Sequence, residues 1–371
     1  MKSISPVLQA VAAMLLLAAC GAGAAPASSP VTTSPAASTA KPAASAPANA
    51  AAPASVSAKP AASSAASAKP AASGATTGAA IAVKVSNPSP AASMLPYYAA
   101  LSQGFFKDQG LDVTVVQLAS PVAITALSKD EVQFMTVPSD AVTGVTKGLP
   151  DRIVYLLWDK APWVLIGKTS YNSIADLKGK IVAVHPSGSS PEAFLQAGLK
   201  SANMTEKDVQ VLHLNGTQDI FTAVVAGKAD AGVVSPPFDI QAAEQGAHTV
   251  AFLGDYLQIP YLGLATSAPY IQQHRDVVVR MIKGLVKGVQ YVRDNADASS
   301  QLLQQNIGVS RSVAQQTYKE MLPLLTKTGE TPVAGVQQTV QLLESVNGSA
   351  LNVNAAEVID DGPRKEALGN S

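Results

Sequence analysis

Short runs rich in β-branched residues alternate with segments of helical spacing along this chain, and this alternation restricts the folds open to it. The first such runs cover 80–86, 111–118, 132–137 and 152–158. Repeated strand–helix–strand order predicts a mainly parallel sheet with helices on both faces. The pattern breaks near Trp163 and then resumes, so we expect a second α/β unit inside the chain. After Ser267 the pattern is helical to the end.

The N-terminus has the pattern of an export signal that ends at the only cysteine of the chain. Met1-Lys2 is positive, 7–17 is apolar apart from Gln9, and "LAAC" ends at Cys20. An apolar core of roughly a dozen residues is too short to span a bilayer stably. "LAAC" resembles the lipobox of bacterial lipoproteins, which implies lipidation of Cys20. The alternative is an ordinary cleaved signal with an incidental cysteine, and in either case an intrachain disulfide is excluded.

Residues 21–80 contain almost only Ala, Pro, Ser and Thr, with "KPAAS" recurring at Lys41, Lys59 and Lys69. Such a segment has few large apolar side chains to bury, so it cannot offset the entropy of ordering itself. We therefore expect a disordered tether between the signal and the folded part.

Charge and hydropathy limit the partners of the folded part. Lys and Arg number 26 and Asp and Glu number 26, giving a formal net charge of +0. There is no basic block beyond Met1-Lys2, so neither nucleic acid nor an anionic membrane surface is expected as a partner. No later apolar run approaches the length of a spanning helix, which would leave lipid on Cys20 as the sole membrane anchor.

Three segments resemble, in type and order, the solute-binding proteins of ABC importers that bind nitrate, sulfonates, taurine or thiamine-precursor pyrimidines. They are "LPYYAALSQGFFKDQGLDVTVV", "SIADLKGKIVAV" and "AGKADAGVVSPPFDIQAAEQG". The resemblance implies the type II periplasmic-binding-protein fold, in which two α/β lobes are joined by two crossing strands, here near 163–173 and 258–267. The implied division is a signal peptide at 1–20, a tether at 21–80, lobe 1 at 81–168, lobe 2 at 169–262, and the C-terminal helical part of lobe 1 at 263–371.

The resemblance also implies a function. The chain would be a monomeric, lipid-anchored, extracytoplasmic binding protein that captures a small monoanion of sulfonate, nitrate or carboxylate type and delivers it to an ABC permease. The alternatives are a binder of a pyrimidine or other aromatic solute, a sensory lipoprotein, or an enzyme on the same fold. Eukaryotic thiamine-pyrimidine synthases resemble this group but carry a cysteine-rich iron-binding motif, which one cysteine cannot supply. We therefore expect no enzymatic activity and no cofactor.

The stretch "IVAVHPSGSSPEAF" follows a predicted strand and is the leading candidate for a ligand cradle. Ligands of open parallel sheets bind beyond the carboxyl ends of the strands, where helices begin. Ser190 is the expected N-cap, with Pro191 as the first helical residue. Gly188 would let the backbone approach a ligand oxyanion, and the hydroxyls of Ser187, Ser189 and Ser190 would donate to it.

The same stretch contains a histidine and several serines, so a serine hydrolase is the competing interpretation. The G-x-S-x-G elbow that such enzymes need is missing, and His185 is too near in sequence for a typical triad base. We expect His185 to pack or hydrogen-bond locally. His213, His248 and His274 show no metal-binding spacing, so no metal is expected.

Other strand ends should face the same cleft and supply further contacts. The remaining candidates are Ser89, Ser93, Pro138, Ser139, Trp158, Trp163 and Ser235. Helix capping explains the serines about as well as ligand contact does, and the rings would serve either the core or a flat solute. No Arg or Lys falls at a predicted strand end, which favours a monoanion or a neutral polar solute over a strongly charged one.

Overall fold

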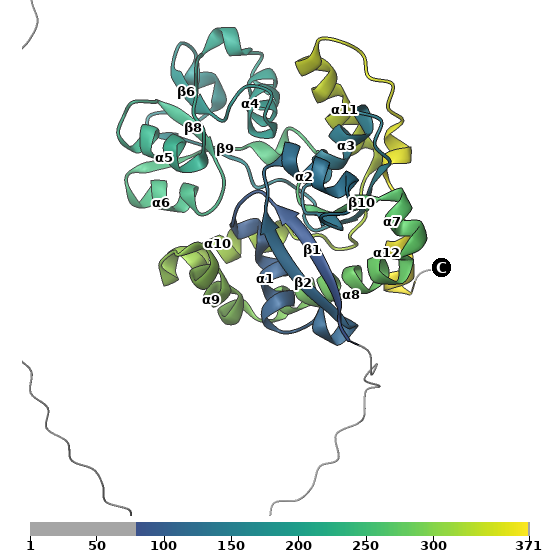
Figure 1. The fold of residues 1–371 in the computed structure, drawn as a ribbon. Coiled ribbons are helices and arrows are strands. Elements are labelled where there is room, and N and C mark those ends of the chain that lie inside the picture. The colour runs from purple at the N-terminus through teal and green to yellow at the C-terminus, as the bar shows by residue number, and fades with distance from the viewer. Residues whose placement is uncertain (1–78, 370–371) are drawn as a thin grey trace, which may run out of the picture. The chain divides into compact units, whose positions relative to one another are not determined.

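The computed structural model describes residues 79–369, which contain two five-stranded sheets (Figure 1). The first sheet has the order β2-β1-β3-β10-β4, with β1 at Ile81–Asn87, β2 at Leu111–Gln117, β3 at Phe134–Met135, β4 at Asp151–Leu156 and β10 at Gly263–Ser267. The second has the order β7-β6-β8-β5-β9, with β5 at Val164–Lys168, β6 at Ile181–Val184, β7 at Gln210–His213, β8 at Ala231–Val234 and β9 at Ala247–Phe252. The two predicted α/β units are therefore present.

Both sheets carry one antiparallel strand in the fourth position. Strand β10 runs antiparallel to β3 and β4, and β5 runs antiparallel to β8 and β9. The pairs β1–β2, β1–β3, β6–β7 and β6–β8 are parallel, as the alternation predicts. The direction of β5 and β10 was not predictable from their sequences, because they are as apolar as their parallel neighbours.

The connections between the sheets begin earlier than the sequence suggests. The first covers 157–163, because β5 already pairs with β8 and β9 in the second sheet. The boundary expected at residue 168 therefore places one strand in the wrong sheet. The second connection covers 253–262, after a strand, β9, that the sequence analysis missed.

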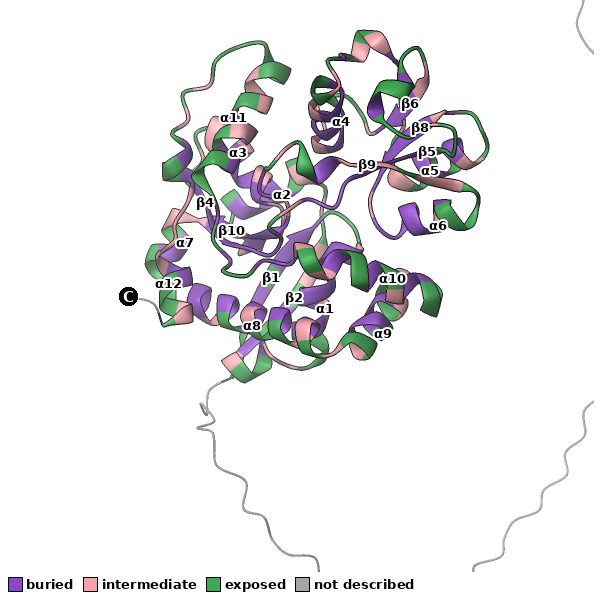
Figure 2. Cartoon of the chain, turned by 180° about the vertical axis from the view of Figure 1, so that it is seen from behind, coloured by how far each residue is buried: buried purple, intermediate pink, exposed green. Residues whose placement is uncertain are grey.

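Helices cover both faces of the first sheet. One face holds α1 (Leu95–Ser102), α8 (Arg275–Asp294), α9 (Ala296–Ile307) and α10 (Arg311–Met321), and the other holds α2 (Ser120–Ser128), α3 (Pro138–Thr146) and α11 (Val333–Asn347). In α8, buried apolar residues recur every three or four positions from Val278 to Val292, which gives the helix one face for the core. Figure 2 shows the same division between buried inner faces and exposed outer faces of these helices. Helix α7 (Ala268–Gln273) joins β10 to α8.

The second sheet has a core on each face as well. Helix α4 (Ser190–Ser201) packs on one side, where Phe194, Leu195 and Leu199 are fully buried. Helices α5 (Thr217–Val225) and α6 (Phe238–Glu244) pack on the other side, around Ile220. Within residues 79–369, the structure has no helix with the length and apolarity needed to cross a bilayer.

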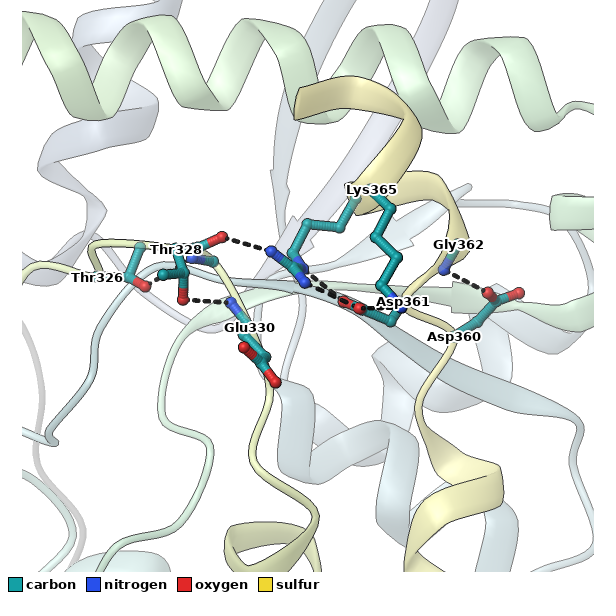
Figure 3. A network of polar contacts seen from close by, with 9 residues as sticks. Thr326, Thr328, Glu330, Asp360, Asp361, Gly362 and Lys365 are labelled. Carbon is teal, nitrogen blue, oxygen red and sulfur yellow. Dashed lines mark hydrogen bonds and ion pairs between the residues drawn. The ribbon is translucent and has the colours of Figure 1, made fainter. Parts of the chain in front are cut away.

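A polar network fixes the C-terminal helix α12 (Gly362–Leu368) to the first lobe (Figure 3). Arg364 is only 7% exposed, and its guanidinium donates to the Asp361 carboxylate and to the Thr328 carbonyl oxygen, the latter at 3.0 Å. Lys365 lies 3.5 Å from the same carboxylate. The Gly329 N–H donates to the Thr326 hydroxyl at 2.8 Å, so the loop that receives α12 is itself hydrogen-bonded.

We expect Arg364→Met to lower the free energy of unfolding by about 2 to 4 kcal/mol, because the Thr328 carbonyl oxygen loses its donor and the partly buried Asp361 carboxylate keeps only Lys365. Arg275→Met is the matched control, since Arg275 makes an exposed ion pair with Glu366 whose loss should cost less than about 1 kcal/mol. Urea denaturation followed by circular dichroism measures both. Equal losses in the two variants would contradict a structural role for the buried arginine.

Candidate functional site

A cavity of about 820 Å³ lies between the lobes, beyond the carboxyl ends of their parallel strands. Parallel strands contribute the segments at or after their ends: 87–93 at the end of β1, Val137 and Ser139 after β3, His185 and Ser190 after β6, 216–218 after β7, and 235–238 with Gln241 after β8. The rest of the wall comes from Trp163 and 260–262 in the connections and from 306–309 at the end of α9 and just beyond it. This is the position at which ligands bind in open α/β sheets.

Three helices of eight or more residues begin at the cavity wall. Ser139 is the second residue of α3, Ser190 the first of α4 and Thr217 the first of α5, and all three line the cavity. The N-terminus of a helix carries unpaired backbone N–H groups and the positive end of the helix dipole. The wall therefore presents partial positive charge at several points.

The described wall residues carry no formal charge, since none is Asp, Glu, Lys or Arg. The polar groups that face the cavity are hydroxyls and amides. They belong to Asn87, Ser89, Ser93, Ser139, Ser190, Thr217, Gln218, Ser235, Gln241 and Asn306, together with the ring atoms of His185 and Tyr261. Recognition here would depend on dipoles and hydrogen bonds rather than on an ion pair.

Three rings meet at one side of the cavity. Trp163 lies edge-on to His185, with 5.3 Å between ring centroids, and edge-on to Tyr261 at 6.1 Å. Burial lowers the pKa of His185 to about 4, so its imidazole is neutral at pH 7. Burial raises the pKa of Tyr261, with a hydrogen bond to Ser93 opposing the rise. The His185 Nε2 atom is 3.0 Å from the hydroxyl of Thr217, 32 residues further along the chain, and His185 also lines the cavity.

The loop after β6 differs from the predicted cradle. Helix α4 begins at Ser190 with Ser189 as its N-cap, so the expected N-cap and the expected position of Pro191 are each wrong by one residue. Neither the Ser189 nor the Ser190 hydroxyl caps the helix. The Glu192 carboxylate instead accepts hydrogen bonds from the loop that precedes it. It accepts the Gly188 N–H at 2.6 Å and the Ser187 hydroxyl at 3.3 Å.

The internal hydrogen bonds of this loop reduce the groups left for a ligand. Ser190 lines the cavity, whereas Ser187, Gly188 and Ser189 do not. The Gly188 N–H is already bonded, and the residue adopts a φ of +79°, which favours glycine. A Cβ atom at Gly188 would lie 3.1 Å from the Val346 Cγ1 atom of α11, so this glycine faces the other lobe instead of the cavity.

The remaining predicted site residues divide into two groups. Ser89, Ser93, Ser139, Trp163 and Ser235 line the cavity. Pro138 and Trp158 do not. Pro138 is the buried first residue of α3, and Trp158 is 1% exposed with its indole N–H donating to the Ser93 carbonyl oxygen at 2.9 Å. The predicted capping role of Ser139 is also wrong, because Val137 occupies the N-cap of α3.

Several wall residues were missed by the sequence analysis. Asn87 ends β1, and Thr217 with Gln218 begins α5, so the rule used for the serines would have found them. Tyr261 lies in the second connection. Asn306 comes from the end of α9, far along the chain, and no local signal marks it.

Known proteins share this fold and part of this sequence. A protein of Bacillus subtilis (strain 168) assigned to the binding of aliphatic sulfonates is 24% identical over 287 residues, which cover 74% of this chain and 86% of that protein. A formylaminopyrimidine-binding protein of Halalkalibacterium halodurans is 23% identical over 63% of this chain and 73% of its own length. The periplasmic aliphatic sulphonate binding protein of Escherichia coli superposes with a TM-score of 0.66 at 19% identity, covering 75% of this chain and 97% of that one.

The superposition on the Escherichia coli structure confirms the two-lobed periplasmic-binding-protein fold that the resemblance of the three sequence segments implied. The family described as NMT1/THI5 like matches residues 91–299, which is more than half of the chain. The chain therefore belongs to the NMT1/THI5-like family.

Proposed function

We propose that this chain is the extracytoplasmic solute-binding component of an ABC importer and captures a small monoanion between its lobes. The observation that carries the proposal is the cavity wall: its described residues include no Asp, Glu, Lys or Arg, and the N-termini of α3, α4 and α5 lie on it. Helix N-termini and hydroxyls stabilise one negative charge, as in many oxyanion sites. A dianion would lack a compensating cation, so sulfonate, nitrate and carboxylate solutes fit better than phosphate.

A flat heteroaromatic solute is the second candidate. The ring cluster of Trp163, His185 and Tyr261 supports it, because such rings pack against planar groups through offset or edge-on contacts. One of the relatives named above binds formylaminopyrimidine, so a member of the family takes a solute of this class. The two candidates differ in charge, and a ligand screen separates them directly.

Attachment to the membrane would come from the N-terminus. The signal peptide at 1–20, including Cys20, and the tether at 21–80 except for its last two residues lie outside the described residues. We propose that lipid on Cys20 anchors the protein to the membrane on its extracytoplasmic side, in the periplasm or at the cell surface, and that the monomeric two-lobed part delivers solute to a permease. The support is the "LAAC" sequence.

Cys20→Ser should give an exported protein without lipid, because the thiol is the group that accepts it. Fractionation of cells into membrane and soluble extracytoplasmic fractions measures the outcome, with the wild-type protein as reference. Retention of the variant in the membrane fraction at the wild-type level would contradict the anchor.

Ser190→Ala should weaken solute binding by about 1 to 3 kcal/mol, or roughly 5- to 150-fold, because a ligand oxygen loses a donor in a desolvated site. Ser187→Ala is the matched control, since Ser187 lies in the same loop but bonds to Glu192 and is absent from the wall. Neither serine hydroxyl caps α4, so the comparison is free of a capping effect.

The solute is first identified by thermal shift with methanesulfonate, nitrate, acetate and a formylaminopyrimidine, since a ligand at 100 times its Kd adds about 2.7 kcal/mol of stability. Calorimetry on the folded variants then gives the affinities. Equal affinities for Ser190→Ala and wild type would remove Ser190 from the site, and stabilisation by the pyrimidine alone would favour the second candidate.

A further inference from the structure

A second cavity, of about 340 Å³, is bounded by residues of both lobes and contains two acidic side chains. Asp239 belongs to the first turn of α6 in the second lobe, and Glu320 lies near the end of α10 in the first. Helices α6 and α10 are in contact. The other lining residues are Pro162, Val164, Pro236, Thr249, Phe252 and Leu324, which are mainly apolar. A buried carboxyl group of the second lobe and an exposed one of the first therefore line the same cavity between the lobes.

The Asp239 carboxyl is held in an environment that disfavours its charge. The residue is 7% exposed, and its Oδ1 atom is buried without a hydrogen-bond donor in the described part of the chain. Burial, together with the charge of Glu320 and a hydrogen bond to it, raises the pKa of Asp239 to about 7. Gln316 donates to the Glu320 Oε1 atom at 3.1 Å, so the second carboxyl is also positioned.

No basic side chain among the described residues lines this cavity. Helix α6 packs on α5, β5, β9 and α10, whose titratable groups are Asp219, Lys168, His248, Arg311, Tyr318, Lys319 and Glu320. Lys168 is ion-paired with Asp230 at 2.7 Å, and His248 lies on the face of β9 opposite Thr249. Glu320 is thus the charged group that faces Asp239.

We propose that Asp239 and Glu320 form a proton-operated latch between the two lobes. With one proton on the pair, a carboxyl–carboxylate hydrogen bond joins α6 to α10 and holds the lobes in the arrangement seen here. When that proton leaves, the buried Asp239 carboxylate and the Glu320 carboxylate line one cavity and repel. The latch acts on the distance between lobes and does not depend on which solute the main cavity takes.

The direction of the pH effect follows from the pKa of Asp239. Because the folded value of about 7 lies above the usual value of 3.8, the folded protein holds a proton that the unfolded chain releases between these limits. The contribution of the pair to the latched state is therefore present below pH 4, declines as the pH rises, and is lost above about pH 7. At pH 5.5 the lobes should be latched, and at pH 8 they should be released.

The test measures the distance between lobes in the full chain. In a Cys20→Ser background, nitroxide labels at Glu244→Cys on α6 and Arg311→Cys on α10 occupy exposed positions in opposite lobes. Electron–electron double resonance at pH 5.5 and pH 8 should show a short-distance population that falls several-fold at the higher pH. Distance is preferred to melting temperature because burial also raises the pKa of Asp140 to about 6 and of Asp151 to about 7.

Substitutions test whether the pH-dependent change in distance between the lobes arises from Asp239 and Glu320. Asp239→Asn and Glu320→Gln should each remove the pH response, because an amide donates a hydrogen bond without titrating. Asp219→Asn, which changes an exposed carboxylate in the first turn of α5, should keep the wild-type response. Glu320 is exposed, so Glu320→Gln carries the test if Asp239→Asn folds poorly. A wild-type distance that is constant between pH 5.5 and 8, or an unchanged pH response in both pair variants, would overturn the latch.

Discussion

Two backbone hydrogen bonds involve the connections that join the sheets, and both connections contribute residues to the cavity wall. The Leu157 N–H donates to the Leu262 carbonyl oxygen at 2.8 Å, and the Leu253 N–H donates to the Trp163 carbonyl oxygen at 2.8 Å. Each connection continues directly into β5 or β10, the antiparallel strand in the fourth position of a sheet. This arrangement directs the carboxyl ends of the parallel strands of both sheets toward one shared cavity.

The charges of the protein are arranged so that the two inter-lobe cavities differ in character. The larger one has only dipoles and neutral groups in its described wall, which suits a solute with at most one charge. The smaller one holds two carboxyl groups that face each other. Selection of solute and control of lobe separation would therefore use different groups.

Local sequence patterns predicted the two α/β units and part of the cavity wall, and the two-lobed fold followed from the resemblance of three segments to a known family. Strand ends followed by helix starts predicted the place of Ser89, Ser139, Ser190 and Ser235, because this rule needs only the order of elements. The direction of β5 depends on strand pairing that no local pattern reports.

Contacts formed only in the folded chain explain two features that the sequence did not predict, the bonded Gly188 N–H and the raised pKa of Asp239. The Gly188 N–H, which was expected to bind ligand, donates instead to the carboxylate of Glu192 four residues further along the chain. Asp239 lies in the first turn of α6, where a carboxylate ordinarily suits the helix dipole. Its raised pKa arises from burial and from Glu320 on another lobe, which only the folded chain brings near.

Amide hydrogen exchange of the full chain, with and without a solute identified by thermal shift, tests the central claim most directly. Binding between the lobes should protect segments of both lobes together, at 87–93 and 137–139 in the first and at 185–190, 216–218 and 235–238 in the second. Protection confined to one lobe, or located away from these segments, would contradict a site between them.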